Sequence, residues 1–110
     1  MATIRKGTVP VTLINTFTVR PENADRLVEL LVEATDSVMR HRPGFVSANI
    51  HVSADRRHVA NYAQWRSKED FEAMRGDRKA GEHMAEAGKL AEHFEPILYE
   101  VVHVEDRAAG

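Results

Sequence analysis

The sequence predicts one α+β domain whose elements follow the order strand, helix, strand, strand, helix, strand. Apolar and polar residues alternate near the start of the chain, apolar residues then recur at helical spacing, and two strand-like segments in the middle are separated by a short polar turn. The chain has 110 residues, of which 43% are hydrophobic, so it has room for one domain with a modest core. We expect the domain to span residues 1–110, with a core between about 9 and 105 because chain ends are seldom packed.

A strand and a long helix are predicted in the first part of the chain. Val9–Val19 is predicted to be a strand, because its apolar residues alternate with threonines at a period of two, and Asn15 falls on the apolar side. Pro21 is predicted to begin a helix that ends at about Arg40. Its apolar residues form one stripe: Leu27, Leu30, Leu31, Ala34 and Val38. Pro43-Gly44 then breaks the helical pattern.

A hairpin and two helical stretches are predicted next. Phe45–Ser53 and His58–Trp65 favour strands, and the short polar turn between them indicates that they pair. Ser67, followed three residues later by Asp70, resembles a capping box, which predicts a short helix ending at about Arg75. A second helical stretch is predicted over about Arg78–Phe94.

The last strand is predicted at Ile97–Glu105, after Pro96 has ended the helix. The order then matches the split βαβ, ferredoxin-like arrangement, in which helices cover one face of an antiparallel sheet. Apolar residues occur on both faces of this last strand, and four share one side of the second strand: Val46, Ala48, Ile50 and Val52. Because a solvated sheet face is normally polar, we expect a second copy of the chain to cover the other face, which makes a homodimer.

Composition and charge exclude several classes of partner. The net charge is −2 and both signs are mixed along the chain, so there is no basic field that would attract nucleic acid. The chain has no cysteine, which excludes disulfides and thiolate sites and fits a reducing compartment. No signal-peptide-like or membrane-spanning apolar run is present, so we expect a cytoplasmic protein without a membrane partner.

The most informative segment is the predicted strand that ends at Trp65. At a period of two, Asn61 and Trp65 share its apolar face, and Asn15 faces the same way from the first strand. Two carboxamides and an indole would line one cavity that suits a flat aromatic ligand, because the indole offers a stacking surface and the amides hold a phenol or enolate oxygen. The alternative is that Trp65 is a core residue and that each asparagine makes a structural hydrogen bond.

The six histidines form no metal-binding motif, since neither HExxH nor facial-triad spacing occurs. No metal site is therefore predicted. His83 has two interpretations, a solvated or capping histidine and an axial haem ligand, which needs only one histidine. The arginines near predicted turns and helix ends are interpreted mostly as surface charges: Arg40, Arg42, Arg56, Arg57, Arg75 and Arg78.

Two segments carry a family resemblance: PGFVSA at residues 43–48 and NYAQWRS at residues 61–67. With them, the chain from about Val11 to Val104 resembles the antibiotic biosynthesis monooxygenase family, nearest to the actinorhodin-type anthrone monooxygenases of aromatic polyketide pathways. The resemblance implies a dimeric α/β barrel and an oxygenase that needs no cofactor. In such enzymes the aromatic substrate is deprotonated to a carbanion, which passes an electron to O₂ and gives a quinone and water.

The resemblance also implies roles for single residues. Asn61 would bind the oxygen of the substrate, and Trp65 would help to stabilise the intermediate. The active-site tyrosines of that group fall at Ile50 and Phe71 here, and its proposed basic arginine falls near Ala85. The resemblance therefore assigns no general base in this chain.

A haem-degrading branch of the same family resembles the chain at other positions. Asn15 and His83 match its first-strand asparagine and its histidine ligand, whereas its tryptophan position holds Met74. Together the two branches make Asn15, Phe71, Met74 and His83 candidates for contact with the substrate. Three functions stay open: a cofactor-independent oxygenase acting on a phenolic or anthrone-like compound, a haem-binding or haem-degrading protein, and a non-catalytic ligand-binding dimer or an enzyme of other chemistry.

Overall fold

The structure of the protein is a computed structural model that describes residues 11–107. Its elements follow the predicted order, with one additional helical turn. They are β1 (Val11–Val19), α1 (Pro21–Ser37), the 3₁₀ turn η1 (Met39–His41), β2 (Phe45–Val52), β3 (His58–Trp65), α2 (Lys68–Arg75), α3 (Arg78–Leu90) and β4 (Ala91–Tyr99). Residues 9 and 10 of the predicted first strand lie outside the described residues.

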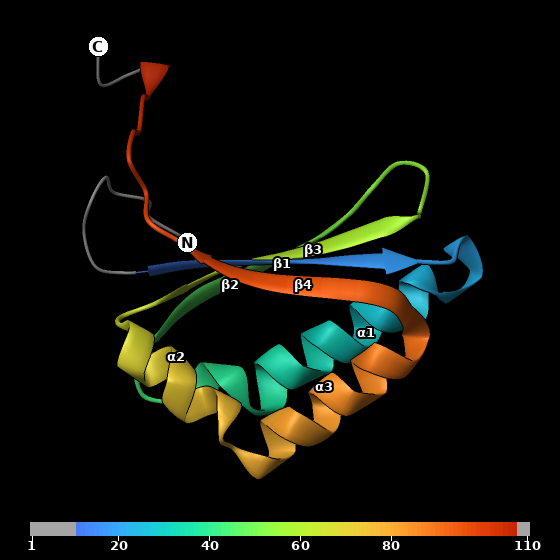
Figure 1. Cartoon of the computed structure of the whole chain (residues 1–110), viewed down its shortest axis with the longest axis horizontal. Coiled ribbons are helices and arrows are strands. Elements are labelled where there is room, and N and C mark those ends of the chain that lie inside the picture. The colour runs from blue at the N-terminus through green and yellow to red at the C-terminus, as the bar shows by residue number, and fades with distance from the viewer. Residues whose placement is uncertain (1–10, 108–110) are drawn as a thin grey trace.

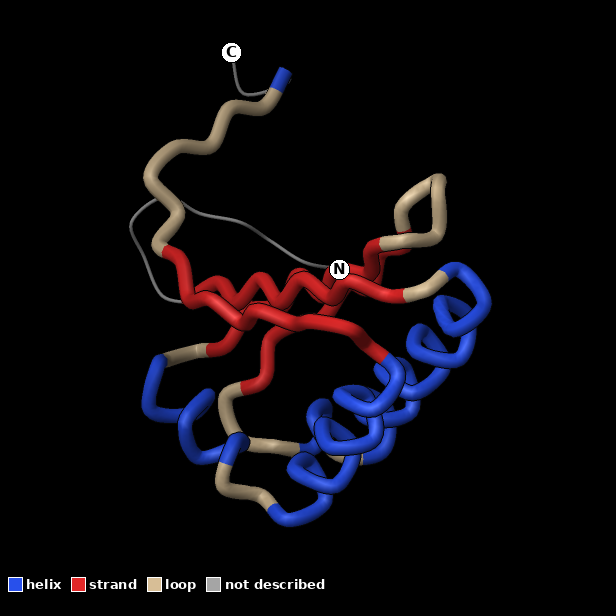
Figure 2. The backbone as a smooth tube through the Cα atoms, turned by 45° about the vertical axis from the view of Figure 1, so that its right-hand side comes forward, coloured by secondary structure: helices blue, strands red, loops and turns tan. Residues whose placement is uncertain are grey.

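The four strands form one antiparallel sheet in the order β2-β3-β1-β4. The helices α1, α2 and α3 lie together on one face of this sheet (Figure 1, Figure 2). α1 and α3 lie side by side under the strands, whereas α2 lies at one end of the helical layer (Figure 1). The predicted α+β, ferredoxin-like fold is confirmed. Within residues 11–107, no helix is both long enough and apolar enough to span a membrane.

The helix α1 packs on the sheet because one stripe of its surface is apolar. Pro21 occupies its first turn, where the missing N–H would have no helical partner. The stripe predicted from the sequence is buried throughout: Leu27, Leu30, Leu31, Ala34 and Val38. The helix ends at Ser37, earlier than the predicted Arg40, and the chain continues through η1.

The last strand lies earlier in the chain than the sequence predicted. β4 covers Ala91–Tyr99, so the prediction of a helix continuing to Phe94 and a strand at Ile97–Glu105 is wrong. Pro96 does not end a helix but lies within β4, opposite Asn15 of β1. β4 is an edge strand, and an edge strand tolerates a proline because only one of its sides must supply hydrogen bonds to the sheet.

An irregularity near the start of β2 changes which residues share a face. The pairing of β2 with β3 shifts between Phe45 and Ser47. As a result Phe45 and Ala48 both pack on the helical side, and Val46 is 46% exposed. The prediction that Val46 shares a side with Ala48 is therefore wrong, because one extra residue in a strand reverses the alternation at that point.

The buried side chains between sheet and helices form two clusters. We call the first the Phe17 cluster; its members are Phe17, Val19, Ala24, Leu27, Leu31, Val59 and Ala87. We call the second the Trp65 cluster; its members are Leu13, Val38, Ala63, Trp65, Phe71, Met74 and Ala80. Both clusters use β1, β3 and the helices, so they lie at two ends of one core.

Candidate active site

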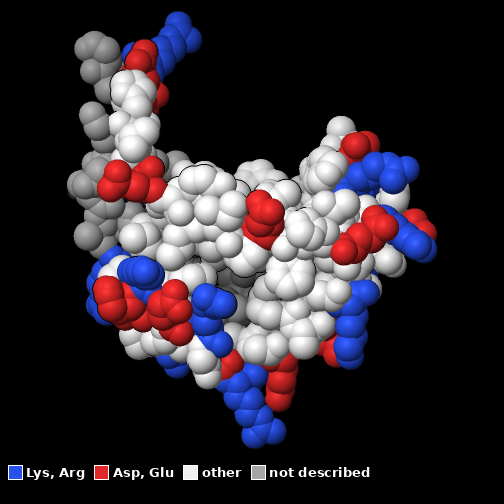
Figure 3. Space-filling view, viewed as in Figure 1, with Lys and Arg blue, Asp and Glu red and all other residues white. Residues whose placement is uncertain are grey.

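A cavity lies between the sheet and the helices and borders the Trp65 cluster. Its volume is about 200 Å³, and it is partly open to solvent. Figure 3 shows the molecule hollowed between the strands and the helices. The described lining residues are mostly apolar: Leu13, Asn15, Leu31, Ala34, Thr35, Met39, Phe45, Ala48, Asn61, Ala63, Trp65, Phe71, Met74, Arg75, Met84, Phe94 and Pro96.

Two asparagines face this cavity from neighbouring strands. Asn15 of β1 and Asn61 of β3 are register partners. Directly opposed residues in an antiparallel pair share a face, with their Cβ atoms about 4.5–5.5 Å apart. The same row continues to Ile50 on β2 and Pro96 on β4, so it crosses the whole sheet. The structure thus brings together the two carboxamides that the sequence singled out.

The side-chain oxygens of both asparagines are buried, and neither has a hydrogen-bond partner among the described residues. An unpaired buried polar group costs on the order of 1–3 kcal/mol, and such groups are rare in native proteins. The neighbouring rows on β1 and β3 offer only apolar side chains: Leu13 with Ala63, and Phe17 with Val59. Within residues 11–107, no structural hydrogen bond holds these oxygens, and they are available to a polar ligand.

An aromatic wall stands beside the asparagine pair. Trp65 is 2% exposed and lines the cavity. The ring of Phe45 meets it edge-on at 5.5 Å between centroids, and the ring of Phe71 lies 6.3 Å away at 63°. These edge-to-face contacts are the favoured geometry of aromatic pairs, so the indole is fixed in place before any ligand binds.

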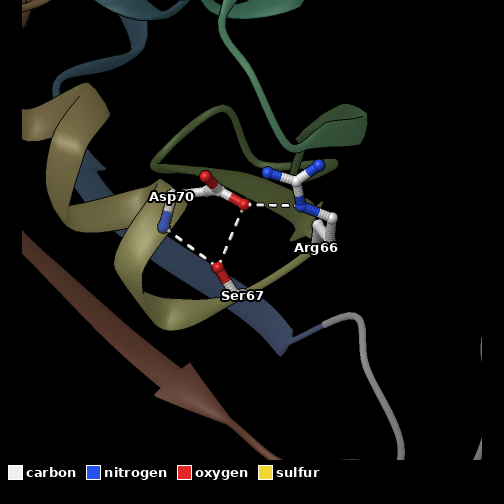
Figure 4. Close-up of polar contacts among 3 residues, drawn as sticks. All are labelled: Arg66, Ser67 and Asp70. Atoms are coloured by element: carbon white, nitrogen blue, oxygen red, sulfur yellow. Dashed lines mark hydrogen bonds and ion pairs between the residues drawn. The ribbon is translucent and has the colours of Figure 1, made fainter.

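The start of α2 is fixed by a small polar network (Figure 4). The hydroxyl of Ser67 accepts the backbone N–H of Asp70 at 3.1 Å and donates to the Asp70 carboxylate at 3.0 Å. Arg66 Nε donates to the same carboxylate oxygen at 2.8 Å. This hydrogen bond from Arg66 lowers the pKa of Asp70 below its ordinary value; Ser67 adds a smaller effect, and burial opposes both. The predicted helix start is confirmed, and it fixes where Phe71 and Met74 meet the cavity.

Gly44 packs directly against this network. Its φ is 86°, which favours glycine, and a Cβ atom at this position would overlap the Asp70 carboxylate. The backbone N–H of Arg66 donates to the Gly44 carbonyl oxygen at 2.7 Å. The turn before β2 and the start of α2 are therefore held together.

His83 does not line the cavity, although the next residue, Met84, does. The side chain is half-buried, and its Nδ1 atom lies 2.9 Å from the backbone oxygen of Lys79. The lining residues include no histidine, and nowhere in residues 11–107 do three or more His, Cys, Asp or Glu side chains gather around a possible metal position. The residues of this cavity do not fit a haem held by His83.

The cavity also includes residues that the sequence did not single out: Met39, Phe45, Arg75, Met84, Phe94 and Pro96. Phe94 and Pro96 were missed because the last strand was placed too late in the chain. Arg75 follows Phe71 by four residues, which puts both on one face of α2. That spacing was the signal that could have placed Arg75 at the cavity.

Most of the chain matches the model of one protein family, described as antibiotic biosynthesis monooxygenase, over residues 10–89. The chain belongs to the antibiotic biosynthesis monooxygenase family. The resemblance carried by residues 43–48 and 61–67 is thereby confirmed, and this member of the family is a monooxygenase.

Three similar proteins are named as monooxygenases or oxygenases. The tetracenomycin-F1 monooxygenase of Streptomyces glaucescens is 44% identical over 103 residues, which cover 94% of this chain and 91% of that protein. The monooxygenase from the ActVA-Orf6 gene of Streptomyces coelicolor, solved with the ligand nanaomycin D, is 28% identical, with a TM-score of 0.79 over 88% of this chain and 91% of that chain. A mutant of SnoaB, a cofactor-independent oxygenase from Streptomyces nogalater, is 20% identical, with a TM-score of 0.77 over 86% of this chain and 95% of that chain, which shows the shared fold.

Proposed function

We propose that this monooxygenase oxidises a phenolic or anthrone-like aromatic compound to a quinone with O₂ and without a cofactor. The observation that carries the proposal is the pair Asn15 and Asn61, which lines an apolar cavity beside Trp65. The side-chain oxygens of this pair are buried and have no hydrogen-bond partner within residues 11–107. A tetracenomycin-F1 monooxygenase and a monooxygenase solved with nanaomycin D are among the similar proteins, which supports an antibiotic-type substrate.

The cavity residues divide into two roles in this proposal. The substrate rings contact the aromatic and thioether side chains of Trp65, Phe71 and Met74, which exclude water from the reacting carbon. A phenol hydroxyl of the substrate donates to the unpaired oxygen of one asparagine, and its ketone oxygen accepts from a side-chain N–H of Asn61 or Asn15, since a carboxamide both donates and accepts hydrogen bonds. An aromatic surface and a polar pair on one wall together orient a flat ligand.

The chemistry follows from stabilising negative charge on that oxygen. Loss of a proton from the carbon opposite the ketone of an anthrone gives an enolate, and an amide N–H directed at the enolate oxygen lowers the free energy of this anion. The carbon then passes electrons to O₂. A C–O bond forms at that carbon and the O–O bond breaks, so that one oxygen atom becomes the quinone carbonyl and the other leaves as water with the two hydrogens. The substrate CH₂ group supplies all four electrons, so no external reductant is needed.

Quinone formation from a simple anthrone tests this function. The wild-type protein is first treated with a chelator to remove metal ions, and no cofactor is added. We expect quinone absorbance to rise faster than in the no-protein blank, with one O₂ consumed per quinone. Asn61→Ala should reduce turnover by about 10–1,000-fold, the range for losing one stabilising donor. Circular dichroism should show an unchanged fold.

A matched control is available on the same sheet. Asn49 of β2 donates to the Tyr62 backbone oxygen at 3.2 Å, is exposed, and does not line the cavity. Asn49→Ala should therefore leave turnover unchanged. Equal rates for Asn61→Ala and the wild type would remove the asparagine pair from the reaction.

We also propose that the protein is a homodimer in which a second copy covers the sheet face opposite the helices. Ile97 and Tyr99 alternate with the cavity-side Pro96 on β4, so they face away from the helices. They are 38% and 45% exposed. After β4 the chain leads away from the sheet (Figure 1, Figure 2) and carries exposed Val102 and Val104. Grouped exposed apolar residues are typical of a partner surface.

Light scattering at micromolar concentration tests the dimer. We expect twice the chain mass for the wild type, and the chain mass for a variant that combines Ile97→Asp with Tyr99→Asp. Val32→Asp changes an exposed apolar residue on α1 and should leave the dimer intact. A wild-type protein with the mass of one chain would refute the proposal.

A further inference from the structure

Arg75 is the one charged residue among the described residues that line the cavity. The other polar groups of the lining are the two asparagines, the indole of Trp65 and the hydroxyl of Thr35, which already donates to the Leu31 backbone oxygen at 2.8 Å. Arg75 therefore places a single cation at an otherwise neutral, mostly apolar cavity.

The guanidinium of Arg75 is held near the cavity without a strong partner. It lies over the Phe71 ring, 5.8 Å from the centroid, and Phe71 in turn contacts Trp65. Its one ion pair within residues 11–107 is with Glu72 at 3.6 Å, and both side chains are about half-exposed, at 60% and 48%. Exposed ion pairs of this kind contribute little to stability, so a competing anion can replace Glu72 as the partner of Arg75.

We propose that Arg75 selects a ligand that carries an anionic group, a carboxylate or an ionised phenol, on its aromatic ring system. The guanidinium presents a planar set of donors that matches a carboxylate or phenolate oxygen. With its rings against Trp65 and Phe71, the ligand places its acidic substituent at Arg75 and another oxygen at the asparagine pair. The aromatic ring system in this proposal rests on the proposed function; the anionic group does not.

The fluorescence of Trp65 gives a binding test that needs no turnover, because it is the single tryptophan of the chain. The probes are anthraquinone-2-carboxylate and its neutral carboxamide, which have nearly the same shape. We expect the wild type to bind the carboxylate about 10–100-fold more tightly, as hydrogen bonds to charged groups contribute about 1.5–3 kcal/mol. Arg75→Gln should abolish this preference and leave carboxamide binding unchanged.

Two further variants separate recognition from a structural effect. Arg78→Gln changes the neighbouring, 93% exposed arginine of α3, which does not line the cavity, and should keep the preference. Glu72→Gln removes the competing carboxylate and should strengthen carboxylate binding. Disruption of α2 by Arg75→Gln would instead weaken both probes equally, and that outcome would overturn the proposal.

The source of the negative charge is assigned with a third probe, 2-hydroxyanthraquinone, titrated through its own ionisation. If Arg75 increases the affinity for the carboxylate probe only, the anionic group is a carboxylate. If Arg75 increases the affinity for the ionised phenol only, the anionic group is a phenolate. Equal binding of charged and neutral probes to the wild type would overturn the proposal while leaving the proposed function standing. Absence of binding by every probe would count against both.

Discussion

The Phe17 cluster and the Trp65 cluster are built on the same strands, yet most members of the Trp65 cluster line the cavity, whereas the Phe17 cluster is closed except at Leu31. In the Phe17 cluster the side chains of Phe17, Leu27 and Val59 are completely buried. At the other end, Ala63 of the Trp65 cluster lies opposite Ala48 of β2, and both carry single methyl groups toward the helices. Large residues fill the first end of the core, and the small pair leaves room at the second end.

The difference shows how one small sheet supports both stability and chemistry. Asn15 and Asn61 lie in the row between the two ends, next to Phe17 and Val59 on one side and Ala63 on the other. The closed end holds the strands in register, and the open end is where we propose that a ligand binds, at the same row. We therefore expect substitutions at the two ends to act on different measured quantities.

The largest expected effect is on the closed end. Leu27→Ala should lower the free energy of unfolding by about 2–5 kcal/mol, because the removed atoms leave a void in tight packing. Turnover per folded molecule should stay near the wild-type value. Urea unfolding and active-site titration measure the two quantities. Val32→Ala on the exposed side of α1 is the control and should change stability by less than about 0.5 kcal/mol.

The opposite result is expected when the open end is filled. Ala63→Leu should weaken binding of an anthraquinone probe, followed by Trp65 fluorescence, by at least about 10-fold, since added methylenes occupy the ligand volume. Stability should change by less than about 1.5 kcal/mol, because the new side chain enters open space. A large loss of stability with intact binding would show that Ala63 belongs to closed packing and would remove the contrast between the clusters.

A smaller effect is expected at the junction that positions α2. Ser67→Ala removes the hydroxyl that accepts the Asp70 backbone N–H, and N-cap losses of this type cost about 1 kcal/mol. Ser37→Ala is the control, because that hydroxyl donates to the Glu33 backbone oxygen near the end of α1 and caps no N–H group. Similar unfolding midpoints for the two variants would contradict the capping role of Ser67.

The last prediction concerns the stability of the protein at acidic pH. The hydrogen bond from Arg66 lowers the folded-state pKa of Asp70 below its ordinary value of 3.8. The ionised carboxylate therefore contributes stability above the ordinary pKa, and this contribution is lost as the pH falls through the lower, folded-state pKa. Asp70→Asn should be less stable than the wild type near neutral pH, and the two unfolding curves should converge in acid. If the difference in stability between Asp70→Asn and the wild type stayed constant on acidification, the ionised Asp70 carboxylate would not be its source.

Much of the fold could be predicted because its signals are local. The alternation from Val11 to Val19, the stripe of α1 and the cap at Ser67 each depend on residues a few positions apart, and all are present in the structure. The position of β4 depends instead on tertiary structure. Pro96 indicates a chain break when considered alone, and only its place on an edge strand makes it compatible with the sheet.

The same distinction applies to the candidate site. Asn61 and Trp65 could be grouped from the sequence because they share one strand at a period of two. That Asn15 lies opposite Asn61 depends on the register of two whole strands, which no short segment specifies. Arg75 was interpreted as a surface charge, and it is indeed 60% exposed. Its place in the cavity lining follows only from where α2 lies.

With the role proposed for Asn15 and Asn61, their opposition across two strands links catalytic activity to the correct assembly of the sheet. If β3 slipped by one residue against β1, Asn61 and Trp65 would turn out of the core together with Val59 and Ala63. A misaligned molecule would thus be inactive and poorly packed at once. Activity recovered after refolding therefore counts correctly registered molecules, and it should track the recovery of native Trp65 fluorescence rather than that of helical circular dichroism.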